Sequence, residues 1–437
     1  MSRLLMQTSS DEKVLIGSAS CSKPFANGLE FNAPAHGTWN IVHIGFRIPG
    51  AHQIYICADN CLRGVVMTAA EMGELGRFSS VVLEEDDMTH SGRIEETTIE
   101  GVTDCLNKLS KIPPVVIIFP VCVHKFMGCD IGYIYRQLES RFPDVKFVRG
   151  FMDPVMQKRG TTPDQRLRKA MSDIIPELPL NADTVTFAGS DMPASANDFK
   201  TILESNNMTV KDTADCRTLE EYYSTGVSSL FICQYPAGLM ATQAISKRLD
   251  RKYIYAPLSF SYDTVKKELS ESGLKIPEGF FENGIRACEE ELGRLKKLAG
   301  DTPVAIDYTA VPRPLSLARF LLDNGINVKT VYLDALDPAE EEDFRYLAEN
   351  YPELVLHSTI HVINRRPVRC AGKVLAAGQK AAWFEGTGNF VNMVEGGGLY
   401  GFAGIAEFIR LMEEAFINEK DLRDIIPRKG LGCRSCI

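Results

Sequence analysis

The sequence predicts an α/β protein of three doubly wound, Rossmann-like domains, with mostly parallel sheets around a central cleft. Three observations lead there. Short apolar runs of β type alternate with amphipathic helical stretches along most of the chain. The 437 residues suffice for three domains of roughly 150 residues each. Hydrophobic residues make up 45% and charged residues 24%, an ordinary globular balance that provides a large core.

The first domain is expected over residues 1–160, and it contains most of the histidines. Its most apolar run is strand-length and reads as a fully buried strand. A connector rich in proline and aspartate, Asp153–Asp164, follows the domain's last strand. The expected elements are a helix at Glu95–Leu109, a strand at Pro114–Pro120, a helix at Ile131–Arg141 and a strand at Val145–Val148.

The second domain is expected over residues 161–300 and includes a further connector at Glu177–Asp183. Its strands are β-branched or aromatic runs, and its helices show apolar residues at a period near 3.6. A long charged helix closes it. The expected strands are Thr184–Ala188, Ser228–Cys233 and Tyr253–Ala256, and the expected helices are Ala194–Ser205, Leu239–Leu249 and Glu282–Leu298.

The third domain is expected over residues 301–437 and repeats the alternation of strand and helix. The pair Asn324-Gly325 is a good helix stop, because glycine adopts the left-handed conformation that ends many helices. The expected strands are Val304–Asp307 and Val328–Leu333, and the expected helices are Leu315–Asn324, Ala339–Glu349 and Phe402–Ala415.

Charge and hydropathy exclude several classes of function. The formal charge of −9 argues against binding the phosphate backbone of nucleic acid. No apolar run approaches the ~20 residues of a membrane span. Met1–Lys13 lacks the apolar core of a signal peptide, so a cytoplasmic protein is expected. In that reducing compartment the twelve cysteines point to metal binding or redox chemistry, with ordinary core packing as the alternative.

Two cysteines come directly after buried strands, where ligands of open α/β sheets bind. They are Cys122 and Cys233. The segment Phe119-Pro-Val-Cys122-Val-His-Lys-Phe-Met-Gly-Cys129-Asp-Ile131 resembles the third cluster cysteine of the nitrogenase component 1 superfamily, in which Gly-Asp-Asp-Ile or similar follows six residues later. The acidic loop Leu83–Gly92 and the helix after it resemble the preceding part of that family. The likeness covers most of the chain and is most specific over residues 80–150.

This resemblance implies an iron–sulfur cluster, either [4Fe–4S] or like the P-cluster, held by thiolates. Cys21 resembles the first family cysteine, but Ala51 stands where the family has its second, so Cys57 or Cys61 would have to replace it. The implied ligands are therefore Cys21, Cys57, Cys61 and Cys122. Packing on one helical face is the alternative for Cys57 and Cys61, because their C-x₃-C spacing allows it. Five of seven histidines, which can ligate iron or hydrogen-bond a cluster, share this region: His36, His43, His52, His90 and His124.

Cys233 corresponds to the cysteine that holds the catalytic cofactor in nitrogenase α chains. The Gly-rich segment Glu395–Gly404 also matches, which makes Gly397 a cofactor-contacting candidate, but Val391-Asn392 stands where the family has its histidine ligand. A cofactor held from both ends is therefore not expected. Cys233 would anchor a different metal cluster or act as a catalytic acid. A buried core cysteine is the alternative.

The resemblance implies an oxidoreductase that works only in a complex and reduces a small molecule, with dinitrogen an improbable substrate. The chain lacks a G-x₄-G-K-[ST] phosphate loop, so it should not hydrolyse ATP. The implied partners are a dimeric, ATP-hydrolysing iron protein and a second component 1 chain, identical or paralogous. Two alternatives stay open: a scaffold or maturase for cluster assembly, and a metal-free protein that binds a small molecule.

Overall fold

The computed structural model describes residues 13–25, 41–89, 92–150, 152, 161–361, 364 and 372–422. The chain divides into two compact units. Unit 1 comprises residues 1–38, 192–210 and 256–437, and unit 2 comprises residues 39–191 and 211–255. Each unit is therefore assembled from separate stretches of the chain, and residues 192–210 leave unit 2 and return to it.

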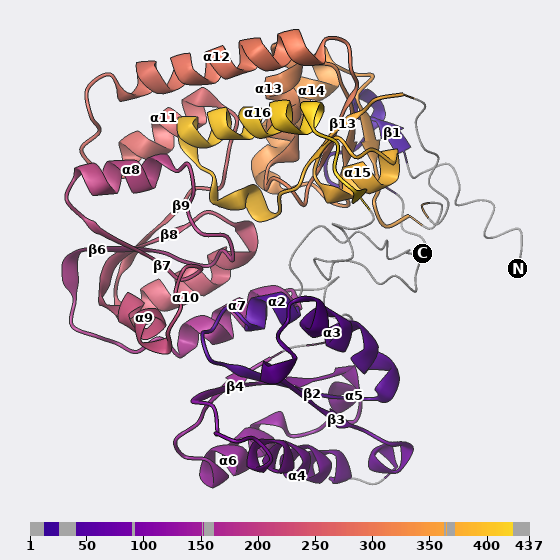
Figure 1. The fold of residues 1–437 in the computed structure, drawn as a ribbon, viewed down its shortest axis with the longest axis vertical. Helices are drawn as coiled ribbons and strands as arrows, with labels where there is room; N and C mark the ends of the chain where they lie inside the picture. The colour runs from indigo at the N-terminus through magenta and orange to yellow at the C-terminus, as the bar shows by residue number, and fades with distance from the viewer. Residues whose placement is uncertain are drawn as a thin grey trace, which may run out of the picture. The chain divides into compact units, whose positions relative to one another are not determined.

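The first sheet belongs to unit 2 and has the strand order β3-β2-β4-β5, with all neighbours parallel. Helices cover both faces: α4 and α6 pack on one, and α3 and α7 on the other (Figure 1). Such two-sided burial explains why β4 is an unbroken apolar run. The elements are α2 (Ile41–Gly45), β2 (His52–Cys57), α3 (Asp59–Glu71), β3 (Phe78–Val82), α4 (Arg93–Asn107), β4 (Val115–Pro120), α5 (Cys122–Phe126), α6 (Ile131–Arg141) and β5 (Lys146–Arg149).

The second sheet also belongs to unit 2 and has the order β7-β6-β8-β9. One apolar cluster, which includes Tyr55, Phe119, Met171, Phe231 and Ile245, joins the two sheets of the unit into one core. The elements are α7 (Pro163–Asp173), β6 (Asn181–Phe187), β7 (Thr209–Asp212), α9 (Leu219–Ser224), β8 (Ser228–Cys233), α10 (Leu239–Leu249) and β9 (Lys252–Tyr255).

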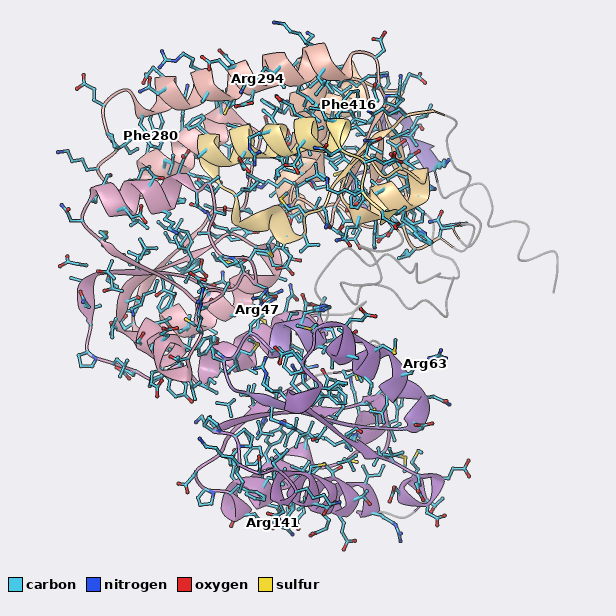
Figure 2. All side chains as sticks on the ribbon, in the orientation of Figure 1. Arg47, Arg63, Arg141, Phe280, Arg294 and Phe416 are labelled. Carbon is cyan, nitrogen blue, oxygen red and sulfur yellow. The ribbon has the colours of Figure 1, made fainter. Side chains whose placement is uncertain are left out.

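The third sheet belongs to unit 1 and has the order β1-β12-β11-β10-β13-β14. Its neighbours are parallel except β1, which pairs with β12 in the antiparallel sense. Figure 2 labels Arg294 on α12 (Phe280–Ala299), where its guanidinium contacts Glu291 of the same helix and lies 3.9 Å from Glu413 of α16 (Gly401–Ile417). The strands are β1 (Lys13–Leu15), β10 (Val304–Asp307), β11 (Val328–Tyr332), β12 (Val355–His357), β13 (Leu375–Ala377) and β14 (Phe390–Val391).

The helices of unit 1 include α8, the connection between β6 and β7 of the second sheet. Its Phe199 ring stacks on Tyr400 at 4.8 Å between centroids, so this helix packs with the C-terminal part of the chain. The helices are α8 (Asp198–Ser205), α11 (Tyr262–Glu271), α12 (Phe280–Ala299), α13 (Pro314–Asp323), α14 (Glu341–Asn350), α15 (Gln379–Glu385) and α16 (Gly401–Ile417). Within the described part of the chain, no helix is both long and apolar enough to span a bilayer.

The expected fold class, α/β with parallel, doubly wound sheets, is confirmed. Two local differences have physical causes. The helix expected from Ala194 starts only at Asp198, because the Asn197 side chain caps it by accepting a hydrogen bond from the Lys200 amide. The expected connector Glu177–Asp183 ends inside β6, whose first three residues are exposed. The three domain boundaries stay a prediction.

Candidate functional site

All three sheets reverse their strand order beside their first central strand, and such switch points are where open α/β sheets bind ligands. In the first sheet β2 has β3 on one side and β4 on the other; β6 and β10 hold the same position in their sheets. We call these the first (β2/β4), second (β6/β8) and third (β10/β13) switch points.

The first switch point carries two of the cysteines singled out from the sequence. Cys57 is the last residue of β2, and Cys122 is the first residue of α5, two positions after β4. Ile56 pairs with Pro120 in the parallel register. Both cysteines therefore lie at the carboxyl ends of two neighbouring strands, on the same side of the sheet. The fold therefore brings two widely separated thiols to the position where a ligand is expected.

Cys57 is fully buried at this edge. Burial, together with the neighbouring Cys61 and Asp59, raises the pKa of its thiol to about 12. It is therefore protonated at neutral pH, and metal binding requires loss of that proton. Cys61 is exposed in the first turn of α3. Cys57 ends a strand, so the two cysteines do not share one helical face, but Cys57 itself packs in the apolar core, as the packing alternative expects.

Two buried histidines lie in the same sheet region. The His124 Nε2 atom lies 3.1 Å from the Thr98 hydroxyl, and its Nδ1 atom is buried without a partner among the described residues. The His52 Nε2 atom lies 2.8 Å from the Ser79 hydroxyl. Burial lowers the pKa of each imidazole to about 4, so both are neutral near pH 7. His36 and His90 lie outside the described residues.

Cys21 lies in unit 1, unlike the other expected ligands. It is half-buried in a turn after β1, where burial and the Glu341 carboxylate raise the pKa of its thiol. Among the described residues no group of three or more Cys, His, Asp or Glu side chains is placed to hold a metal ion. The described thiols of one chain therefore do not form a complete cluster site. Three further cysteines, Cys370, Cys433 and Cys436, lie outside the described ranges. The ligand set stays a prediction.

The second switch point carries Cys233, the last residue of β8. It is fully buried, its Sγ atom donates to the Tyr235 carbonyl at 3.2 Å, and burial raises the pKa of the thiol. The loops after β6 and β8 touch closely beside it: a Cβ on Gly189 would lie 2.8 Å from the Gly238 backbone. Cys233 therefore has the environment of a protonated core thiol, and its catalytic role stays a prediction.

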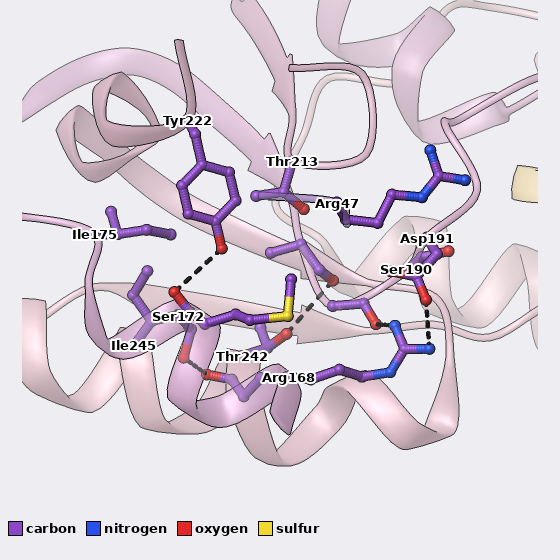
Figure 3. A pocket seen from close by; sticks show the side chains of 14 residues that line it. Arg47, Arg168, Ser172, Ile175, Ser190, Asp191, Thr213, Tyr222, Thr242 and Ile245 are labelled. Atoms are coloured by element: carbon purple, nitrogen blue, oxygen red, sulfur yellow. Dashed lines mark hydrogen bonds and ion pairs between the residues drawn. The ribbon is translucent and has the colours of Figure 1, made fainter. Parts of the chain in front are cut away.

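A cavity of about 40 Å³ lies between α7, α10 and the loops after β6 and β7 (Figure 3). Figure 3 shows the Arg168 guanidinium directed toward Asp191, and these buried side chains form an ion pair of 2.7 Å. Arg168 also donates to the Gly189 carbonyl at 3.0 Å. The Tyr222 and Thr213 hydroxyls that line the cavity donate to backbone carbonyls at 3.2 and 3.3 Å. The cavity has room for about one water molecule. We therefore interpret it as a packing gap between structural elements and not as a ligand site.

The Gly-rich segment around Gly397 lies in unit 1, between two backbone segments. The amides of Glu395 and Gly396 donate to the carbonyls after β10, at 2.9 and 2.8 Å. A Cβ on Gly398 would lie 1.9 Å from the Pro193 carbonyl oxygen. Close backbone packing accounts for that glycine. Gly397 is half-buried with φ +61°, and its contact with a cofactor stays a prediction.

The third switch point carries polar residues that the sequence reasoning missed. Tyr308 follows β10, and Lys380 lies in α15 directly after β13. The Lys380 ammonium donates to the Tyr308 hydroxyl at 2.8 Å and to the Thr359 hydroxyl at 3.0 Å. The sequence did contain a signal for them, because Tyr308 directly follows the expected strand Val304–Asp307, at an end where ligands of α/β sheets bind.

Comparisons with known proteins agree with this architecture at the level of the fold. No family model matches the chain, and no curated protein matches it. A solved structure titled "Nitrogenase Cp1 at pH 6.5" superposes with a TM-score of 0.65 at 11% identity, covering 90% of this chain and 94% of that chain. A second, "Nitrogenase Cp1 at pH 5", gives a TM-score of 0.56 at 11% identity, covering 94% and 95%. The chain thus has the fold of these nitrogenase chains.

Proposed function

We propose that this chain is the electron-accepting component of a nitrogenase-like reductase. It receives low-potential electrons from an ATP-dependent iron protein through an iron–sulfur cluster and reduces a small molecule other than dinitrogen. The observation that carries the proposal is the first switch point, where a component 1 fold brings Cys57 and Cys122 to neighbouring strand ends. Cys61 is the adjacent exposed donor.

The partners follow from what the chain lacks. The sequence has no phosphate loop for ATP, so a separate ATPase delivers the electrons. The predicted ligands Cys21, Cys57, Cys61 and Cys122 would give the four thiols that a [4Fe–4S] cluster takes, but no three donors are placed together among the described residues. In this proposal a second component 1 chain, identical or paralogous, completes the site. Two residues near the Gly-rich segment, Val391 and Asn392, replace the histidine ligand of the family cofactor, which argues against dinitrogen as the substrate.

The test is iron content. The protein is purified anaerobically with its co-expressed partner chain, and iron, sulfide and electron paramagnetic resonance spectra are measured. Cys122→Ser is expected to lose at least half of the iron, because a serine oxygen is a poorer ligand than a thiolate. Cys216→Ser is the matched control, since this half-buried thiol donates to the Asp212 carbonyl at 3.2 Å in the second sheet. Equal iron in the wild type and in Cys122→Ser would sink the proposal.

A further inference from the structure

Lys380 at the third switch point is a buried cation that the reductase proposal does not yet use. Its side chain is nine-tenths buried. Its two hydrogen bonds go to neutral hydroxyls, and the nearest carboxylate oxygen, of Asp334, is 4.0 Å away. Burial of an ammonium without a close ion pair costs free energy, which the Tyr308, Asp334 and Asp307 groups around Lys380 offset. The position of Lys380 beside the carboxyl ends of β10 and β13, where ligands of α/β sheets bind, points to a chemical role.

The hydrogen bonds of Lys380 continue in both directions. On one side Thr359 accepts from Lys380 and donates to Asp334 at 2.6 Å, and Asp334 is partly exposed. On the other side Tyr308 accepts from Lys380 and is itself partly exposed. Asp334, Thr359, Lys380 and Tyr308 thus form a chain of hydrogen bonds with a partly exposed residue at each end. All four belong to unit 1.

The proton of the Tyr308 hydroxyl is available for donation. Within the described part of the chain it accepts one hydrogen bond and donates none, so its O–H faces no protein acceptor. The ammonium also lies 4.7 Å from the Tyr308 ring centroid. The Tyr308, Asp334 and Asp307 groups around Lys380 raise the pKa of its ammonium against the effect of burial, so it stays charged at neutral pH. Burial raises the pKa of the Tyr308 phenol, and the Lys380 ammonium opposes that rise because it stabilises the phenolate.

We propose that Tyr308 is the proton donor of the reduction and that Lys380, Thr359 and Asp334 return its proton. This inference rests on the proposed function, in which a low-potential iron protein supplies the electrons. A substrate atom that has gained an electron pair takes the Tyr308 proton, which breaks the O–H bond and leaves a phenolate. Lys380 transfers a proton to that phenolate. The neutral amine then regains a proton from solvent along the Thr359 hydroxyl and the Asp334 carboxylate.

The first test measures how strongly Lys380 acts on Tyr308 and needs no substrate. Tyrosines are replaced by a difluorotyrosine, whose more acidic phenol titrates while the protein is folded, and the ¹⁹F signal of residue 308 is assigned with Tyr308→Phe. In Lys380→Met its titration midpoint is expected to rise by about one pH unit or more. Lys266→Met, which removes a half-buried lysine of α11, is expected to leave it unchanged. An unchanged midpoint in Lys380→Met overturns the proposal.

The second test measures turnover in the reconstituted complex, as oxidation of reduced methyl viologen with solvent protons as the electron acceptor. Tyr308→Phe is expected to lower this rate about 100-fold, the usual share of a general acid. Thr359→Val should lower the rate less than Tyr308→Phe does. Thr359→Ser keeps a hydroxyl and should have the wild-type rate. The iron content of all variants should equal that of the wild type. Wild-type rates in Tyr308→Phe overturn this inference alone, whereas iron-free wild-type protein overturns the proposed function and, with it, this inference.

Discussion

At the scale of single residues, burial decides which cysteines of the first switch point are chemically available. Cys61 is exposed, whereas Cys57 is fully buried with the pKa of its thiol raised to about 12. Because the thiolate is the reactive form, iodoacetamide at pH 7.5 should label Cys61 within minutes and leave Cys57 unlabelled in the metal-free folded protein. Peptide mass spectrometry measures both. Equal labelling of the two would show that the edge of the sheet opens readily.

A second residue, His357, should make the protein acid-sensitive. Burial lowers the pKa of its imidazole to about 3, so the native state binds fewer protons than the unfolded chain below the usual histidine value of about 6.5. The stabilisation is therefore complete above that pH and is lost as the pH falls toward 3. His357→Phe keeps the contacts with the Tyr332 and Phe384 rings and should remove about 2 kcal/mol of the loss between pH 7 and 5. Urea unfolding at both pH values measures this; an identical slope in the variant contradicts it.

At the scale of elements, the start of α16 depends on a close contact that only glycine permits. Gly401 has φ +73°, and a Cβ there would lie 2.2 Å from Asp198 Oδ2, whose carboxylate accepts from the Phe402 amide at 2.6 Å. Gly73 has the same φ but open space around it. Gly73→Ala should cost about 1–2 kcal/mol through backbone strain alone. Gly401→Ala adds the steric contact and should cost about 3 kcal/mol or more.

The two glycine variants form a matched pair, so their difference isolates the contact with Asp198. Chemical unfolding of both proteins and of the wild type gives the two free-energy changes. Equal losses would mean that α16 shifts at little cost and that the carboxylate does not fix its position. The comparison also tests the packing of the Gly-rich segment, because Gly398 and Gly401 both contact residues 193–198.

At the scale of the whole molecule, local pattern predicted many of the elements, whereas contacts between distant residues left no local signal. The strands Ser228–Cys233 and Val304–Asp307 and the helices Ile131–Arg141 and Leu239–Leu249 match the sequence prediction in both bounds, because apolar runs mark them. The strand β2 was missed, and with it the environment of its last residue. The Lys380 network was missed because its partners lie 21 and 72 positions away in the chain. No local period reports such contacts.

The predicted boundaries of the second domain can be tested by expressing residues 161–300 alone. Three helices of that fragment, α8, α11 and α12, pack against α16 in the intact chain. Without α16 their apolar faces would be exposed to water, so the fragment should aggregate or bind a hydrophobic dye strongly. Size-exclusion chromatography and dye fluorescence measure both. A monodisperse, dye-silent fragment with cooperative unfolding would establish the domain as predicted.

The pairing of β1 with β12 has a consequence for biosynthesis. Lys13–Leu15 emerges early from the ribosome, but its partner Val355–His357 is made some 340 residues later. At roughly 5–20 residues per second, this nascent strand waits on the order of tens of seconds before its hydrogen bonds can form. During that interval its unpaired amides and carbonyls are open to foreign strands. Yield in the cell should therefore depend on chaperones that shield nascent chains, and on the speed of translation, more than the stability of the finished protein would suggest.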